Sequence, residues 1–206
     1  MLNFAQFSKL IIPQNKVLAR LGYQRGKTRL DTRTLALIEQ EILLAEKLAT
    51  PKQVIANANI VLGNNSTVHL EPGLTINSKK IYELLKNSSS AYGFAVTAGP
   101  YIEEKIKHLI AEKDTAKALV LDAIGSVITE ELAEITNNQI ITEAEQVGSQ
   151  TTRRFSPGYG DWELLEQTDF LRWLGAETIG IKLNSKCQMI PEKSVSALIG
   201  IIKETK

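Results

Sequence analysis

The feature that most constrains this fold is a long helical pattern that begins after Asp114. Asp114 or Thr115 can accept a hydrogen bond from a first-turn amide and so start a helix. Apolar side chains then recur at helical spacing, at Ala116, Leu119, Val120, Ala123, Ile124, Val127 and Ile128. Because one side of this segment carries so little polar surface, we expect the helix to form the centre of the core.

This helix also carries a glycine and three acids whose roles the pattern leaves open. A glycine inside a helix costs about 1 kcal/mol relative to alanine, so Gly125 predicts the close approach of another backbone or of a ligand. Glu131 and Glu134 fit a solvated face, whereas Glu130 can turn toward a cleft. We expect the helix to end near 137–138, with a separate helix following at 140–148.

The remaining segments alternate between hairpin-like strands and paired helices. Strands are predicted at 54–62, 67–70, 92–98, 178–183 and 194–202, and further helices at 13–21, 32–48, 78–86, from 101, and from 163 to 174. The regular strand and helix alternation of a doubly wound parallel sheet is missing. We therefore expect an α+β fold with a mixed or antiparallel sheet. Without a repeat or linker, residues 1–206 are expected to form a single domain.

Composition excludes several classes of function. The 206 residues are 43% apolar and 23% charged, and a net charge of +1 disfavours nucleic acid or an anionic membrane as partner. Cys187 is the single cysteine, and His69 and His108 are not at metal-ligand spacing, so no metal is expected. The chain starts without a signal-peptide pattern and contains no membrane-spanning apolar run, which predicts a cytoplasmic protein.

The strongest site candidate is the stretch Arg154-Phe155-Ser156-Pro157-Gly158-Tyr159-Gly160-Asp161-Trp162. Proline fixes its own φ, while Gly158 and Gly160 permit positive φ and let a ligand approach the backbone. Arg154 can grip a carboxylate through two hydrogen bonds, and Tyr159 offers a ring face and a hydroxyl. The alternative interpretation is a strand-to-helix turn in which Trp162 caps the core.

Several motifs resemble one known family in the same order along the chain. Arg154–Tyr159 resembles the Arg-x-x-x-Gly-Tyr signature of the S-adenosylmethionine-binding activation domain of cobalamin-dependent methionine synthase. Met189–Ala197 is similar to its Pro-x-x-Ser-Val-Ser-Gly strand, Thr97–Gly99 to its Thr-x-Gly, and Thr129–Glu134 to its Ala-Glu-Ala-Phe-Ala-Glu segment. The Ser-Pro-Gly-Tyr-Gly-Asp-Trp sequence resembles standalone bacterial relatives of that domain more closely still.

The resemblance implies an antiparallel α+β fold with S-adenosylmethionine in a surface groove. By position, Arg154 would bind the ligand carboxylate, the backbone around Ser156 would meet the adenine, Tyr159 would line the groove, and Glu130 would be an acidic contact. It also implies an accessory role without a catalytic base: the protein would present the methyl donor to oxidised cobalamin carried by a partner methionine synthase or related corrinoid methyltransferase. Flavodoxin or ferredoxin would supply the electron.

The sequence also departs from the family. The family has a histidine-bearing stretch after Gly-Tyr, which is replaced here by Gly160–Glu163. An acidic contact that the family carries near the start of the domain has no clear counterpart within residues 1–30. The tyrosines that follow the Ser-Val-Ser-Gly strand in the family have no counterpart before Lys206. A scaffold of the same fold that docks on corrinoid proteins without binding S-adenosylmethionine is therefore the alternative. A self-sufficient methyltransferase is disfavoured, because the glycine-rich loop of Rossmann-type methyltransferases is absent.

Overall fold

An antiparallel sheet forms the centre of the fold in the computed structural model, which describes residues 7, 10–24, 26–64 and 66–203. Within those residues the sheet has six strands, and every pairing is antiparallel. Their order is β3 (Leu74–Asn77), β2 (Thr67–Glu71), β1 (Lys52–Leu62), β4 (Ser90–Thr97), β8 (Ser194–Lys203) and β5 (Ser149–Thr151). A separate hairpin pairs β6 (Lys182–Leu183) with β7 (Met189–Ile190). The predicted α+β class with an antiparallel sheet is confirmed.

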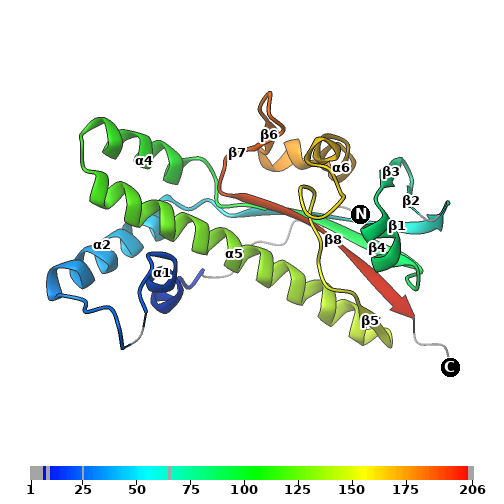
Figure 1. Cartoon of the computed structure of the whole chain (residues 1–206), viewed down its shortest axis with the longest axis horizontal. Helices are drawn as coiled ribbons and strands as arrows, with labels where there is room; N and C mark the ends of the chain where they lie inside the picture. The colour runs from blue at the N-terminus through cyan, green and yellow to red at the C-terminus, as the bar shows by residue number, and fades with distance from the viewer. Residues whose placement is uncertain (1–6, 8–9, 25, 65, 204–206) are drawn as a thin grey trace.

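Helices cover both faces of this sheet (Figure 1). One face carries the long α5 (Thr115–Gln146), with α1 (Gln14–Arg20), α2 (Thr32–Leu48) and α4 (Tyr101–Ala111) packed around it. The other face carries shorter segments: α3 (Lys79–Leu85), α6 (Gln167–Leu174) and two 3-10 turns, Leu164–Glu166 and Ala176–Ile179. No helix of the described chain is long and apolar enough to cross a membrane.

The two faces enclose two separate hydrophobic clusters, which follow from strand alternation. On β4, Phe94 and Val96 point into the cluster beneath α5, while Ala95 between them points into the cluster beneath α6. On β8, Ile199 and Leu198 divide in the same way. The central strands are therefore apolar on both sides, and side chains at their ends are left to build surface sites.

The predicted helix break at 137–138 is wrong, because α5 continues without interruption to Gln146. Leu132, Ile140 and Ala144 keep one face of the helix buried across the expected break. Thr136 sits fully buried beside it, and its hydroxyl lies 2.7 Å from Oε1 of Gln53 on β1. Packing against the sheet therefore outweighs the weak helix propensity of the two asparagines.

Leu119, which was predicted to face the core, lies in solvent instead. This residue of α5 is 65% exposed. The buried side of α5 at this point is formed by Ala118 and Leu121. The predicted helical period was correct, but the buried side of the helix is rotated away from the side that the apolar residues alone had indicated.

The strand expected at 178–183 is also wrong over most of its length. Ala176–Ile179 forms a 3-10 turn, and only Lys182–Leu183 is extended. Gly175 and Gly180 flank the turn with φ of 68° and 87°, in the left-handed region that favours glycine. The alternation of apolar residues that predicted a strand arises here from a tight turn. Conversely, β3 was not predicted, although it forms a short hairpin with β2.

Candidate functional site

The site forms where the ladder along the outer edge of β8 stops. Phe155 and Leu198 exchange two backbone hydrogen bonds of 2.9 and 2.8 Å, after which the chain turns away from the sheet at Ser156. Because hydrogen-bonding direction alternates along an antiparallel strand, the backbone groups of Ser194 and Ser196 point to the same outer side as those of Leu198. None of the described segments continues the ladder there, so this end of β8 is an open edge.

The chain bends at residues 156–162, within the stretch predicted as the site, and this bend lies directly beside the edge. Gly158 and Gly160 have φ of 89° and 63°, which confirms the positive φ expected at both positions. The amide of Gly158 donates to the Trp162 carbonyl at 2.8 Å, and the amide of Trp162 donates to the Tyr159 carbonyl at 3.1 Å. The Trp162 ring is buried and meets Phe170 edge-on at 5.2 Å between ring centroids. The alternative interpretation, a turn capped by Trp162, therefore holds as well.

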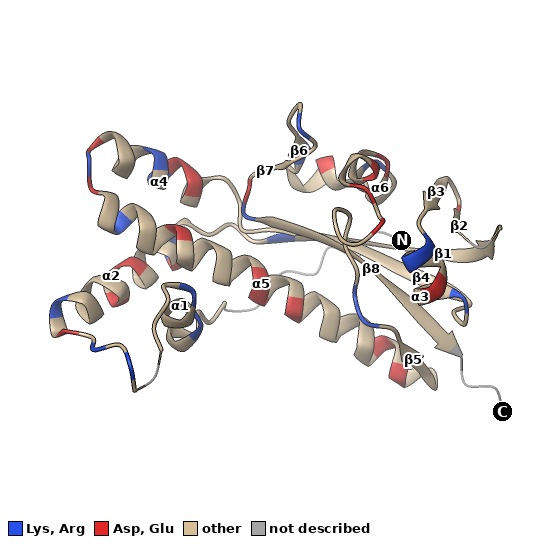
Figure 2. Cartoon of the chain, in the orientation of Figure 1, with Lys and Arg blue, Asp and Glu red and all other residues tan. Residues whose placement is uncertain are grey.

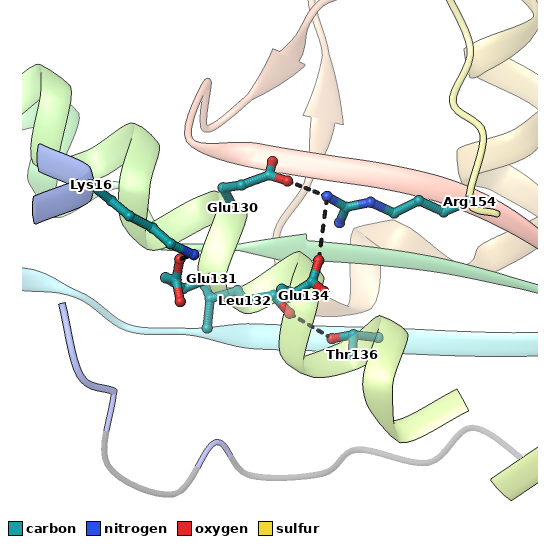
Figure 3. Close-up of polar contacts among 7 residues, drawn as sticks. All are labelled: Lys16, Glu130, Glu131, Leu132, Glu134, Thr136 and Arg154. Atoms are coloured by element: carbon teal, nitrogen blue, oxygen red, sulfur yellow. Dashed lines mark hydrogen bonds and ion pairs between the residues drawn. The ribbon is translucent and has the colours of Figure 1, made fainter. Parts of the chain in front are cut away.

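Arg154 reaches from the segment before the bend toward α5 (Figure 3). Its Nη2 forms an ion pair with Oε1 of Glu130 and lies 3.8 Å from Oε2 of Glu134. Both glutamates are about half exposed, and they stand one turn apart on the same side of α5. The guanidinium thus spans the space between the bend and the helix without entering the hydrophobic interior.

The three acids of α5 divide differently from the expected pattern. Glu134 was assigned with Glu131 to a solvated face, but it points with Glu130 toward Arg154 (Figure 3). Glu131 instead pairs with Lys16 of α1 at 2.5 Å, on the other side of the helix. In Figure 2, the basic stretch after β5 runs beside α5, on which acidic positions recur.

The other terminal nitrogen of the Arg154 guanidinium, Nη1, has a different environment from Nη2. Nη1 is buried and has no hydrogen-bond partner among the described residues. A buried, unpartnered donor costs about 1–3 kcal/mol or more when charged, which favours a ligand or solvent atom at that position. The guanidinium therefore has one nitrogen paired with protein acids and one that is unpaired but shielded from solvent.

An open groove of about 460 Å³ lies between the bend, the β8 edge and α5. Of the residues predicted to bind ligand, Arg154, Ser156, Tyr159 and Glu130 all line it. Gly158 does not, because it closes the bend behind the groove. The other lining residues are Arg153, Phe155, Pro157, Gln167, Met189, Ser194, Val195 and Ser196. Residues up to 66 positions apart in the chain, from Glu130 to Ser196, are thus brought to one surface.

Ser196 is a candidate that sequence reasoning missed. Its side chain is 2% exposed, it lines the groove, and its hydroxyl has no partner in the described part of the chain. Ser194 on the same strand uses its own hydroxyl internally, donating to the Pro191 carbonyl at 2.7 Å. Strand alternation in the Ser-Val-Ser motif puts both serines on one face of the sheet. The site could be recognised only from the structure, which shows that pairing on the outer side of β8 ends beside them.

Gly125 serves packing inside the protein and does not contact the groove. A Cβ at this position would lie 3.0 Å from Cγ2 of Ile102 and 3.1 Å from Cε of Lys193. The buried Lys193 side chain crosses there and places Nζ 2.7 Å from Oδ1 of Asp122 and 2.9 Å from the Ser126 hydroxyl. This cluster joins the start of β8 to α5, and so fixes the strand edge relative to the helix that carries Glu130.

The Thr97–Gly99 motif lies away from the Arg154 groove. Thr97 and Gly99 line a different hollow, of about 520 Å³, between the start of α4 and the β6–β7 hairpin. Gly99 has φ of 85°, and its amide donates to the Thr97 hydroxyl at 3.1 Å. Within the described residues, no three His, Cys, Asp or Glu side chains gather as a metal site would require.

Comparison with known families identifies the fold that carries this groove. Residues 84–206, more than half of the chain, match the family described as "Vitamin B12 dependent methionine synthase, activation domain". The chain belongs to this family. The match covers β4 to β8 and therefore every lining residue of the groove, whereas β1 to β3, α1 and α2 lie before it.

A solved structure extends the likeness over the whole chain. The crystal structure titled "Crystal Structure of the MetH Reactivation Domain bound to AdoHcy" is similar at a TM-score of 0.72 and 15% identity, covering 100% of this chain and 80% of that chain. At this identity the likeness shows the fold alone. No curated protein matches the chain by sequence. The resemblance to the activation-domain family expected from the motifs is confirmed by both the family match and the fold.

Proposed function

We propose that the groove binds S-adenosylmethionine and that the protein presents it as methyl donor for the reductive methylation of cobalamin carried by a partner protein. Membership of the activation-domain family and the fold of an AdoHcy-bound reactivation domain support this proposal. AdoHcy, S-adenosylhomocysteine, is what remains of S-adenosylmethionine after the methyl group has left.

The observation that carries the proposal is the charge arrangement around Arg154. An amino acid end group has a carboxylate and an ammonium on one carbon, and it needs a cation and an anion close together. Nη1 of Arg154 is a free donor for the carboxylate, while Glu130 and Glu134 beside Nη2 are acceptors for the ammonium. Because Nη1 is buried in the ligand-free protein, binding requires the side chains that cover it to move, while the ion pair at Nη2 can remain.

The rest of the ligand fits the remaining walls. A planar adenine has hydrogen-bonding groups on its edge and needs a flat, partly apolar slot. Pro157 and Phe155 supply apolar surface, and the open edge of β8 beside Ser196 supplies backbone groups and a hydroxyl. Tyr159 is 69% exposed at the groove mouth, where its ring can cover the ligand. The backbone around Ser156 and Gly158 would complete the slot.

The composition of the groove favours an accessory role over a self-sufficient enzyme. None of the described lining residues is a histidine, cysteine or lysine, and Glu130 is held by Arg154. Methyl transfer from a sulfonium to a reduced corrinoid needs positioning, and no protein base. As the resemblance to the activation-domain family implies, we propose that cobalamin is carried by a partner methionine synthase or related corrinoid methyltransferase in the cytoplasm, with flavodoxin or ferredoxin as electron donor.

One observation favours a second candidate, a scaffold that does not bind S-adenosylmethionine. Arg154 already has two acidic partners in the free protein, so part of its charge is compensated without ligand. If both glutamates hold the guanidinium firmly, the ligand carboxylate gains little. Such a protein would dock on corrinoid proteins through its surface alone.

Calorimetric titration with S-adenosylmethionine separates the two candidates. For Arg154→Ala we expect a ten- to hundred-fold loss of affinity, since a charged hydrogen bond is worth about 1.5–3 kcal/mol. Arg172→Ala is the matched control, because Arg172 is exposed, paired with Asp169 and outside the groove. Its affinity should equal that of the wild type.

Glu130→Gln adds a second test, because it removes the acceptor assigned to the ammonium. We expect a several-fold loss of affinity for this variant. Equal weak binding by the wild type and Arg154→Ala would support the scaffold, and tighter binding by Glu130→Gln would show that this glutamate competes with the ligand. Turnover of small acceptors with labelled donor and no corrinoid protein would contradict the accessory role.

A further inference from the structure

We infer that Asp161 is a positioning residue, which ties the ligand-binding bend to the first turn of α3 and so holds Tyr159 and Pro157 at the groove. This inference rests on the proposed function for its consequence, but its structural part stands independently. Asp161 lies near the end of the bend, and it does not line the groove.

The tie consists of several hydrogen bonds to one carboxylate. Oδ1 of Asp161 accepts from the Ser78 hydroxyl at 2.5 Å and from the Lys80 amide at 3.2 Å, and Oδ2 accepts from the Lys79 amide at 3.0 Å. The Ser78 hydroxyl and these backbone amides hold the pKa of Asp161 below its ordinary value. The carboxylate is therefore charged at neutral pH, as this contact requires.

Helix α3 does not depend on this carboxylate for its own start. Ser78 is the N-cap of α3, and its hydroxyl accepts from the Ile81 amide at 3.1 Å, as a serine N-cap ordinarily does. Without Asp161, the amides of Lys79 and Lys80 would face solvent, because both residues are exposed. The carboxylate consequently contributes more to the placement of the bend than to the formation of α3.

The end of the bend is restricted by its backbone and its packing. Gly160 has φ of 63°, and its α-carbon lies beside the flexible Lys80 side chain of α3. Directly after Asp161, the Trp162 ring is buried against Phe170. Two successive residues thus fix the end of the bend, one by polar contacts to α3 and one by burial under α6. Tyr159, two residues before Asp161, is left exposed at the groove mouth.

The test compares Asp161→Ala and Asp161→Asn with the wild type, and uses Glu163→Gln as a matched change of one negative charge at an exposed neighbour. Amide hydrogen exchange is measured on the ligand-free proteins. We expect the amides of Gly158 and Trp162 to exchange about tenfold faster in Asp161→Ala, with those of β4 unchanged. Asp161→Asn keeps one acceptor oxygen and should lie between the two. Glu163→Gln should behave as the wild type.

Titration with S-adenosylmethionine provides the functional readout. We expect about a tenfold loss of affinity in Asp161→Ala, partial recovery in Asp161→Asn, and no change in Glu163→Gln. Unchanged exchange in the bend of Asp161→Ala would overturn the inference, and so would faster exchange throughout the sheet, since that would show general destabilisation. If the wild type binds no ligand, the proposed function fails, and the exchange of the bend still decides whether Asp161 positions it.

Discussion

The two faces of the sheet are built in different ways. On one face, the single helix α5 runs across the sheet, and buried side chains such as Leu121, Ile124 and Ile128 follow one another along it. On the other face, α3, α6 and two 3-10 turns are short, and individual hydrogen bonds join them. Asp161 ties the bend to α3, and Gln167 donates to the Cys187 carbonyl at 2.6 Å to hold the β6–β7 hairpin.

This difference indicates which face contributes most to stability and which face determines the geometry of the groove. The groove lies at the margin between the two faces, with Glu130 on the α5 side and the bend on the α6 side. Because α5 is fixed by many apolar contacts, changes there should lower stability with little effect on the site. The α6 face also has a buried hydrophobic cluster, but its elements are short and the bend packs directly on them, so changes there should move the groove even at a modest cost in stability.

The largest expected effect comes from truncating the α5 core. Ile124→Ala removes a fully buried side chain between α5 and the sheet and should lower the free energy of unfolding by about 2–5 kcal/mol. Urea denaturation measures this loss. Affinity for S-adenosylmethionine in the folded protein should stay within about twofold of wild type. A tenfold weaker binding would show that the α5 face positions the site as closely as the other face does.

A smaller loss of stability with a larger effect on the site is expected on the α6 face. A Cβ at Gly93 would lie 2.5 Å from Cζ3 of Trp173 and 3.0 Å from Cε2 of Phe170. Gly93→Ala should therefore displace α6, cost about 1–3 kcal/mol, and disturb the bend through the contact between Phe170 and Trp162. Urea denaturation and ligand titration report the two effects. Unchanged affinity would contradict the division between the faces.

We also expect the stability of the α5 face to depend on pH through Glu41 of α2. Glu41 on α2 is buried, and Oε2 has no partner among the described residues; Lys117, Asp114 and Lys105 lie around it. Burial raises the pKa of Glu41, so the native state favours the protonated acid. Its stabilising contribution is complete below the ordinary glutamate pKa and is lost as the pH rises through the raised value.

Glu41→Gln removes this ionisation and should be more stable than the wild type by about 1 kcal/mol at pH 8. The difference should shrink as the pH falls and should vanish below the ordinary glutamate pKa of 4.5, where the wild-type acid is protonated in both states. Thermal unfolding at several pH values measures it. A constant difference across that range would show that the pKa of Glu41 is the same in the native and the unfolded protein, as for a fully solvated acid.

The smallest expected effect is that of Arg154 on stability. Its ionic partners Glu130 and Glu134 are half exposed, and such pairs contribute about 0–1 kcal/mol. Arg154→Ala should therefore unfold within about 1 kcal/mol of the wild type in urea. A loss of several kcal/mol would place Arg154 among the structural residues and weaken its role in the groove.

The sequence predicts those parts of the fold and site that depend on local chemistry. The bend could be predicted because Pro157 fixes its own φ and Gly158 and Gly160 permit positive φ, and Gly175 ends α6 with a positive φ in the same way. The predicted break at 137–138 failed because burial against the sheet keeps α5 helical there. Ser196 was missed, and Asp161 was named in the predicted stretch without a role, because their roles depend on the end of the β8 ladder and on the placement of α3, which lie far away in sequence.

The most direct test of the central claim is a crystal structure of the protein with S-adenosylhomocysteine. We predict that the ligand lies between the bend and the open edge of β8, with its carboxylate within hydrogen-bonding distance of Nη1 of Arg154 and its ammonium near Glu130. A ligand bound elsewhere, or a groove that stays empty at saturating ligand with Arg154 still held by Glu130 and Glu134, would contradict the account.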